Sequence, residues 1–556
     1  MSSKDTSIQS FHLGEIEAGV RQRLGTWRRE HMGRRLWEKD FTVWSPTPLP
    51  EITNRLGWLT LPRTMEPEST AINTFADDIK AEGIRHVVLL GMGGSSLAPE
   101  VFMACFGNAP GYPELIILDS THPGQVAATA SLVDLKTTLF IVASKSGTTI
   151  EPLSFFRYFY NRVSSLTSNP GRHFIAITDP GSELETIAHD RGFRRVFLAE
   201  SDVGGRYSAF AAFGLVPAAL IGVDTSDLLR RAQSVALLCG PAVSEEENPG
   251  LFLGAVLGEL ALAGRDKMTF IASPTLKTFP DWLEQLIAES TGKDEKGIVP
   301  VIGEPLAAPD AYGPDRCFVY IALEEEVEPK VEEQIAQLEA AGHPVCRFVL
   351  TDKTGLAGEI FRWEMAVAAA GVVLGIHPFN QPDVQTAKEL ARRAMADGKR
   401  TKKGCDTTVP VESCWDRRQA MTWIRNKVKP GDYIGLQAYL KPDPEIMRGL
   451  GHLRSQVSSR LHLATTLGLG PRFLHSTGQL HKGGPNTGVF LQLIDSPQND
   501  IAVPETDYTF CELFAAQALG DYHALLQRDR RVLRVNLGAD PAHGLRMLAD
   551  AVEATE

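Results

Sequence analysis

Short apolar segments alternate with helical stretches from about residue 76 to residue 240, and this alternation constrains the fold more than any other feature. The apolar runs are only a few residues long, which is the length of buried strands. Strands separated by helices form parallel sheets that helices cover on both faces. The predicted strands of this block are 86–90, 115–118, 138–143, 173–177 and 195–198.

Two further blocks follow. The second alternates in the same way and ends in two long helical runs, 356–374 and 384–397; its predicted strands are 268–272, 297–302, 317–322 and 345–350. A polar, lysine-rich connector near 398–413 leads to the third block. We therefore predict an α/β protein with two αβα sandwich domains that contain parallel sheets. The predicted parts are an N-terminal helical segment (1–75), the two sandwich domains (76–245 and 246–400) and a C-terminal α/β block (401–556).

Two turns of the first block are rich in hydroxyl groups and glycine. The sequence Gly91-Met-Gly-Gly-Ser-Ser96 follows one predicted strand, and Ala143-Ser-Lys-Ser-Gly-Thr-Thr149 follows another; each precedes a helix. Hydroxyls and backbone N–H groups at a helix N-terminus suit a phosphate monoester. Neither turn fits a nucleotide-binding motif. The alternative is a pair of ordinary strand-to-helix turns that use Gly and Ser for backbone conformation and capping.

Composition narrows the classes of partner. The 556 residues carry a formal net charge of −12 without a long basic tract, which disfavours a nucleic-acid partner. The seven cysteines are scattered without a Cys-x-x-Cys pair, which favours reduced thiols over a disulfide framework or a zinc site. With no charged-then-apolar leader and no run of 18 apolar residues, we expect a soluble cytoplasmic protein without membrane contact.

Two segments present candidates for catalysis. A double glycine in Val203-Gly-Gly-Arg-Tyr-Ser208 presents Arg206, although a surface arginine in a loop is the commoner case. Helical spacing places Glu289 on the same stripe as Trp282 and Leu286. A carboxylate on an apolar face is costly unless it lies in a cleft or is paired, and such a setting suits a general base. The alternative is a boundary glutamate paired with Lys293.

Two later segments also carry chemistry. A proline-rich turn leads into a helix whose first turns contain Lys388; a lysine there favours an anionic partner, although a surface lysine is the alternative. The segment Phe473-Leu-His-Ser-Thr-Gly-Gln-Leu-His-Lys-Gly-Gly484 contains His475 and His481. Their spacing, without a nearby carboxylate, makes a poor metal site, so we expect no metal and favour acid–base work by one histidine.

The order of these motifs resembles the glucose-6-phosphate isomerases, a family built of two sugar-isomerase (SIS) domains. The matching segments are 91–97, 144–149, 203–208, 289–293, 303–305 and 380–388. The resemblance implies that Glu289 moves a proton between C2 and C1 and that Arg206 stabilises the enediolate. It implies that Lys388 and Gln381 contact the sugar and its phosphate end, and it requires no cofactor. The implied substrate-binding residues are Gly94, Ser95, Ser144, Lys145, Ser146, Thr148, Thr149, Gln285 and Gln381.

One departure from the family concerns the histidine that opens the sugar ring. In the family this histidine closely follows Gly-Glu-Pro, but here Gly303-Glu-Pro305 runs into Leu-Ala-Ala-Pro-Asp. A similar His-x-x-x-Gln setting occurs in the third block, so we assign the role to His475, with His343, His377 and His481 as competitors. This order resembles the isomerase half of bifunctional transaldolase/glucose-6-phosphate isomerases, although no transaldolase-like region is evident.

The resemblance implies the reversible conversion of glucose 6-phosphate to fructose 6-phosphate in glycolysis and gluconeogenesis. The alternatives are an isomerase of another sugar phosphate, such as mannose 6-phosphate, and a non-catalytic sugar-phosphate-binding regulator. Family members are usually dimers whose ring-opening histidine comes from the neighbouring subunit. A displaced His475 could equally act within its own chain, so the homodimer stays open. An association with a transaldolase activity also stays open.

Overall fold

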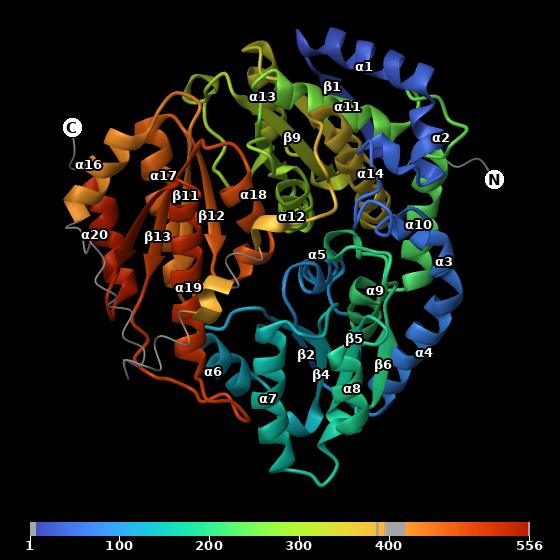
Figure 1. Ribbon diagram of the computed structural model, residues 1–556, viewed down its shortest axis with the longest axis vertical. Helices are drawn as coiled ribbons and strands as arrows, with labels where there is room; N and C mark the ends of the chain where they lie inside the picture. The colour runs from blue at the N-terminus through green and yellow to red at the C-terminus, as the bar shows by residue number, and fades with distance from the viewer. Residues whose placement is uncertain (1–6, 385–388, 394, 396–416, 554–556) are drawn as a thin grey trace.

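The computed structural model describes residues 7–384, 389–393, 395 and 417–553, and within these residues it contains three β-sheets flanked by helices (Figure 1). The predicted α/β class with parallel sheets is confirmed. Predicted strand positions in the first two blocks are also confirmed, to within a few residues at the ends.

The first sheet is parallel throughout, in the order β3-β2-β4-β5-β6. Within β2, Val87 and Leu89 face one core cluster, whereas Val88 and Leu90 face another. Both faces are therefore buried, which explains why these strands appear in the sequence as continuous apolar runs. The strands are β2 (His86–Leu90), β3 (Glu114–Leu118), β4 (Thr138–Ala143), β5 (Phe174–Thr178) and β6 (Arg195–Leu198). The accompanying helices are α4 (Glu66–Ala81), α5 (Leu97–Phe106), α6 (Pro123–Leu132), α7 (Ile150–Ser164), α8 (Glu183–Asp190) and α9 (Ala212–Leu220).

The second sheet has the order β1-β10-β9-β7-β8, and β1 (Ser7–His12) pairs antiparallel with β10. The prediction that residues 1–75 are helical and loop-like missed this edge strand. The reason is its pattern: Ile8 points to solvent and Phe11 is half-buried, so no apolar alternation marks it. The other strands are β7 (Lys267–Ala272), β8 (Val299–Val301), β9 (Arg316–Leu323) and β10 (Val345–Leu350). Associated helices are α1 (Ile16–Glu30), α2 (Met32–Trp37), α3 (Leu61–Thr64), α10 (Thr225–Leu238), α11 (Pro249–Leu262), α12 (Phe279–Thr291), α13 (Pro329–Ala340) and α14 (Leu356–Leu374).

The third sheet lies in the C-terminal block and is parallel, in the order β12-β11-β13-β14. Leu480 and Phe490 of this block share a core cluster with Ala288 of the second, and Phe510 packs into a cluster of the first. The block therefore contacts both preceding blocks, as Figure 1 shows. Its strands are β11 (Tyr433–Tyr439), β12 (Ala464–Leu469), β13 (Gly488–Ile494) and β14 (Arg531–Asn536). Its helices are α16 (Arg417–Lys427), α17 (Pro444–Leu461), α18 (Gly478–Gly483), α19 (Phe510–Gln527) and α20 (Pro541–Glu553).

Helices α11 and α14 pack closely because glycines line their contact. Gly250, Gly254 and Gly258 recur every fourth residue of α11 and therefore share one face. A Cβ atom at each would lie within 2.7 Å of a heavy atom of α14. The helix predicted at 356–374 is confirmed, and nearly all of its residues are buried.

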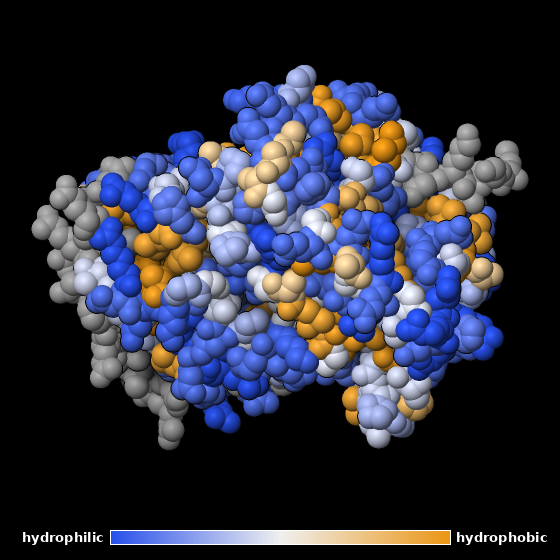
Figure 2. Space-filling view, turned by 90° about the horizontal axis from the view of Figure 1, so that it is seen from above, coloured by the Kyte–Doolittle hydropathy of each residue, from blue (hydrophilic) through white to orange (hydrophobic). Residues whose placement is uncertain are grey.

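Two further features of the fold concern its surface and its cysteines. Hydrophilic side chains cover most of the face in Figure 2, and apolar residues appear there in separate patches. Within the described ranges, no helix combines the length and the apolar character needed to cross a membrane. Cys105, Cys239, Cys317 and Cys346 are buried thiols, as expected. Cys511 is disulfide-bonded, so the prediction of reduced thiols is wrong at that position.

We expect Gly254→Ala to destabilise the protein. The new Cβ would lie 2.6 Å from the Cβ of Ala369 and 2.7 Å from the carbonyl oxygen of Ala366. Overpacking of this kind costs about 1–3 kcal/mol, which should lower the midpoint of urea unfolding. The matched control is Gly25→Ala on α1, where the nearest heavy atom is 3.8 Å away and the change favours helix by up to about 1 kcal/mol. Equal midpoints for the two variants would contradict this account of the helix contact.

Candidate active site

The three blocks meet at a cleft of about 520 Å³. It lies beyond the carboxyl ends of β2 and β4, where both hydroxyl-rich turns follow their strands. The predicted residues in its lining are Gly94, Ser95, Ser144, Lys145, Ser146, Thr148, Thr149, Gln381 and His475. Lining residues that the sequence did not single out include Arg55, Glu151, Asp179, Arg392, Lys482 and Gln517.

Glu289 and Arg206 form a buried ion pair at the inner end of this cleft. The Oε1 atom of Glu289 is 3.2 Å from Nη1 of Arg206, and its Oε2 accepts a hydrogen bond of 3.0 Å from Gln285. Neither Glu289 nor Arg206 belongs to the lining itself, whereas Gly205, the chain neighbour of Arg206, and Gln381, its hydrogen-bond partner, do. The structure therefore brings the predicted carboxylate and guanidinium together, directly behind the wall of the cleft.

The alternative pairing of Glu289 with Lys293 is wrong. The Nζ atom of Lys293 donates instead to the carbonyl oxygens of Ser290, at 3.1 Å, and His377, at 2.6 Å. Burial, together with the nearby Arg206 charge, holds the pKa of Lys293 well below its usual value. The arginine is thus the cation that faces the carboxylate.

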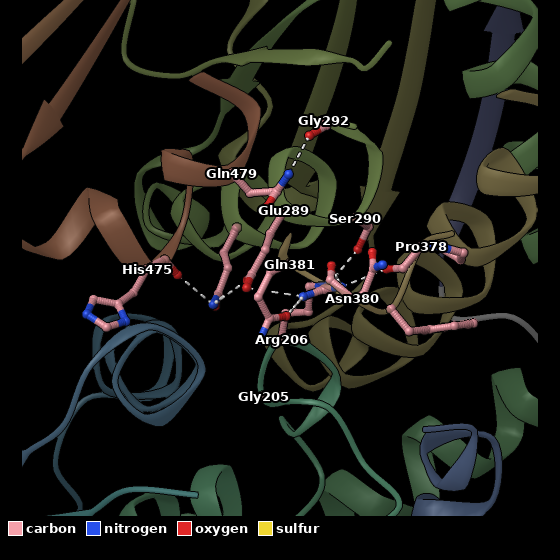
Figure 3. A network of polar contacts seen from close by, with 12 residues as sticks. Gly205, Arg206, Glu289, Ser290, Gly292, Pro378, Asn380, Gln381, His475 and Gln479 are labelled. Carbon is pink, nitrogen blue, oxygen red and sulfur yellow. Dashed lines mark hydrogen bonds and ion pairs between the residues drawn. The ribbon is translucent and has the colours of Figure 1, made fainter. Parts of the chain in front are cut away.

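Arg206 is held rigidly by oxygen atoms from two other segments. It lies in the short 3₁₀ helix Gly205–Tyr207, is 3% exposed, and donates from Nε to Oγ of Ser290 at 2.8 Å. Its Nη2 donates to the carbonyl oxygens of Pro378, at 2.7 Å, and Asn380, at 3.1 Å. Its Nη1 donates to Oε1 of Gln381 at 3.0 Å. Figure 3 shows these contacts converging on the guanidinium.

Glycines allow two loops of the first block to touch. A Cβ atom on Gly94 would lie 2.1 Å from the carbonyl oxygen of Gly205, so no larger residue fits there. Gly93 has φ +56°, and a Cβ atom on it would lie 2.8 Å from the carbonyl oxygen of His475. The first hydroxyl-rich turn therefore lies between the loop that carries Arg206 (the arginine loop, 203–208) and the loop that carries His475 (the histidine loop, 472–477).

The second hydroxyl-rich turn forms a compact cradle at the N-terminus of α7. Ser144 Oγ donates to Thr149 Oγ1 at 3.0 Å, and the hydroxyls of Ser146 and Thr148 are also 3.0 Å apart. Gly147 has φ +71°, and a Cβ atom on it would lie 2.6 Å from the backbone nitrogen of Leu184. This geometry requires glycine and places four hydroxyls beside the positive end of the α7 dipole.

Within the cleft, Lys145 is paired with a carboxylate of the protein itself. Its Nζ lies 2.8 and 2.6 Å from the two carboxylate oxygens of Asp179. Burial lowers the pKa of Lys145 and raises that of Asp179. The cation predicted to bind phosphate is therefore present in the lining, but Asp179 already neutralises it.

His475 reaches the cleft from the third block of the same chain. It ends the 3₁₀ helix Arg472–His475, and its Nε2 is 3.0 Å from Oε1 of Glu151 in the first turn of α7. Its carbonyl oxygen accepts a hydrogen bond of 2.8 Å from Gln285, which ties the histidine loop to α12. In Figure 3 the imidazole points away from Glu289.

The competing histidines do not line the cleft. In His377, Nε2 is 2.9 Å from the carbonyl oxygen of Pro50 and Nδ1 accepts from an amide, while burial lowers its pKa to about 4. His343 packs against Tyr312 and Phe318, and burial lowers its pKa. His481 is buried beside Gln437, and burial holds its pKa well below the usual value.

Other predicted and unpredicted residues complete the site. Lys388 lies outside the described residues. Gln285 has an Oε1 atom that is buried without a hydrogen-bond partner among the described residues. Glu151 directly follows the cradle in sequence, yet its type carries no signal that separates it from any acidic residue in a first helical turn. Gln517, on α19, lies in a segment without any motif.

A cluster of carboxylates surrounds Arg472 at the start of the histidine loop. Arg472 contacts Glu100, and its Nη1 is 3.2 Å from Oδ2 of Asp119. Burial raises the pKa of Asp281 to about 6, and burial with the nearby Asp281 charge raises the pKa of Glu284 to about 8. A proton held by Glu284 limits its repulsion with the neighbouring carboxyl of Asp281. Nowhere in the described ranges are three or more His, Cys, Asp or Glu side chains arranged to hold a metal ion.

Comparison with known proteins confirms the resemblance stated from the motifs. Residues 73–299 match the family model described as phosphoglucose isomerase. A glucose-6-phosphate isomerase of Methanocaldococcus jannaschii is 28% identical over 352 residues, which cover 56% of this chain and 85% of that protein. The enzyme of Staphylococcus saprophyticus is 27% identical over 382 residues, which cover 60% and 85%.

A solved structure shares the fold. The crystal structure of a glucose-6-phosphate isomerase from Chlamydia trachomatis aligns with a TM-score of 0.57 at 20% identity. The alignment covers 71% of this chain and 89% of that one. At this identity the likeness shows that the two proteins have the same fold.

We expect Glu284→Gln to remove a pH dependence of stability. The raised pKa means that the folded protein keeps a proton that the unfolded chain releases above its ordinary value of 4.5. This contribution to stability is fully present below that value and is lost as the pH rises through about 8. The Tm of the variant relative to the parent should therefore rise between about pH 5 and about pH 9. Calorimetry at several pH values measures the difference in Tm between the variant and the parent. A difference that does not change with pH would contradict the raised pKa of Glu284.

Proposed function

We propose that this chain catalyses the reversible isomerisation of glucose 6-phosphate to fructose 6-phosphate by general-base proton transfer through an enediolate. The observation that carries the proposal is the Glu289–Arg206 pair held beside a cradle of hydroxyls at a helix N-terminus. The family match and the named relatives bear out the activity predicted from the sequence. A non-catalytic sugar-phosphate regulator would have no need of this pair.

The phosphate end of the substrate is assigned to the second hydroxyl-rich turn. The hydroxyls of Ser144, Ser146, Thr148 and Thr149 and the backbone N–H groups at the start of α7 suit a phosphate monoester. Gly94 and Ser95 supply the facing wall from the first turn. Lys145 contributes its charge only in part, because Asp179 shares it.

The isomerisation itself is assigned to Glu289 and Arg206. Glu289 removes the proton from C2 and returns it to C1, and Arg206 stabilises the negative charge that develops on the oxygens. Fixed donors in a water-poor site are worth several kcal/mol for such a charge. Gln381 is exposed and accepts from Nη1 of Arg206, so a rotation of its side chain would open that donor to a substrate oxygen. The buried Oε1 of Gln285 has no hydrogen-bond partner among the described residues, so it would accept from a sugar hydroxyl that reached it.

Ring opening is assigned to His475, acting within its own chain. Its contact with the Glu151 carboxylate favours a proton on Nε2, which leaves Nδ1 to exchange a proton with the sugar. The position of His475 in the lining, beside the cradle, supports this role.

The remaining assignments concern Lys388, the assembly of the protein and its location. We place Lys388 at the sugar and phosphate end by resemblance alone. A homodimer, a cytoplasmic location and an association with a transaldolase activity remain proposals of the same kind. A coupled assay with fructose 6-phosphate and with mannose 6-phosphate, run with a chelator present, distinguishes this activity from that of a related sugar-phosphate isomerase.

Glu289→Gln should lower kcat about 10²-fold or more, because the amide cannot accept the proton. The parent and the variant are compared in a coupled assay, and far-UV circular dichroism checks that the fold is retained. Glu325→Gln, at an exposed position on the turn after β9, serves as the matched control and should leave kcat unchanged. Normal turnover by the Glu289 variant would remove this residue from the mechanism.

His475→Ala should separate ring opening from proton transfer. We expect turnover of cyclic glucose 6-phosphate to fall by about 10²-fold, the scale of general acid–base catalysis. A tetrose 4-phosphate has no free hydroxyl that can close a ring, so the variant should still exchange its C2 proton with solvent deuterium, as followed by NMR. If both substrates lose activity equally, ring opening belongs to another group.

A further inference from the structure

Gln517 connects the third block to the partner of the proposed ring-opening histidine. It lies on α19, is 5% exposed and lines the cleft. Its Nε2 donates to Oε1 of Glu151 at 2.7 Å. The same Glu151 oxygen is 3.0 Å from Nε2 of His475. Two groups of the third block therefore meet on one carboxylate oxygen of the first block.

Thr121 anchors the carbonyl end of the Gln517 amide. Its hydroxyl, which is fully buried after the end of β3, donates to Oε1 of Gln517 at 2.6 Å. With the amide turned over, its carbonyl oxygen would face the carboxylate oxygen of Glu151, and the two acceptors would repel each other. An ionised Glu151, which can only accept, therefore sets the amide with its N–H toward the carboxylate, and the Thr121 hydroxyl holds the opposite end in place.

The orientation of Glu151 in turn selects the tautomer of His475. An acceptor held at Nε2 favours the ring form with its proton there, and Nδ1 then remains a proton acceptor. Without the Gln517 hydrogen bond, the carboxylate of Glu151 would lose a neutral donor that fixes its position. The histidine could then adopt the other tautomer, which presents no acceptor to the sugar at Nδ1.

We propose that Gln517, anchored by Thr121, is a positioning residue for ring opening, acting through Glu151 on His475. The proposal rests on the ring-opening role assigned to His475 above. It adds a second contribution of the C-terminal block: the block supplies both the histidine and the amide that keeps the histidine's partner in place.

The experiment uses the full chain with two nearly isosteric changes, Gln517→Met and Thr121→Val. Turnover of cyclic glucose 6-phosphate under saturating conditions reports ring opening followed by isomerisation. Solvent deuterium exchange on a tetrose 4-phosphate reports proton transfer alone. We expect Gln517→Met to lower the first rate about tenfold or more, the scale of a lost hydrogen bond to a charged group. Thr121→Val removes a hydrogen bond between neutral groups and should lower that rate several-fold. Exchange on the tetrose should stay near the parent value.

Two further variants sharpen the test. Thr121→Ser keeps the hydroxyl and should restore the parent ratio of the two rates. Thr138→Val is the matched control: Thr138 is fully buried at the opposite end of β4, where its hydroxyl donates to the carbonyl oxygen of Asp134 at 2.7 Å. Its ratio should equal that of the parent. The double variant Gln517→Met/Thr121→Val should lose no more than the worse single variant, because both act through one chain of hydrogen bonds.

Different outcomes overturn different claims. If His475→Ala separates the two rates but Gln517→Met does not, the positioning role of Gln517 is wrong and the proposed function stands. If both rates fall together in Gln517→Met, the residue acts on the fold and the proposal also fails. A parent protein that does not isomerise glucose 6-phosphate would overturn the proposed function and this inference with it.

Discussion

The buried ion pair between Glu289 and Arg206 is the interaction on which the rest of the site depends. Removing two charges from water costs a large desolvation free energy, and the attraction between the two charges alone does not compensate for it. Here the guanidinium also donates to Ser290 and to carbonyl oxygens of the segment that follows α14, while Gln285 donates to the carboxylate. The pair is stable only where all three segments meet, so the assembled fold creates the proposed reactive centre.

Close approach of the backbone makes this convergence possible. Gly94 lies against Gly205 without room for a Cβ atom, and Gly93 lies against the histidine loop. The first sheet thereby places its hydroxyl-rich turns within reach of groups from the second and third blocks. The same principle recurs in the core, where glycines of α11 let it pack against α14. In both places, glycine has no side chain, so two elements approach closely and hold each other in one arrangement.

The sequence predicted features whose physical cause is local. Buried strands of a parallel sheet need apolar residues on both faces, so their positions could be read from runs of residues; β1, held by backbone pairing at an edge with Ile8 in solvent, could not. The ordered motifs singled out Glu289 and Arg206 as candidates, and a displaced His-x-x-x-Gln setting singled out His475. Contacts across the fold could not be predicted, because nothing in the sequence near Glu151 or Gln517 records that the two side chains meet.

The route by which His475 enters the cleft has a consequence for how the candidate site is assembled. Glu289, Arg206, the cradle and His475 all belong to one polypeptide, and the contacts that hold them lie within it. Dilution in a cell that makes few copies would leave these groups together, since no encounter between molecules is needed to assemble them. Each chain then carries a complete set of the described groups from the moment it folds.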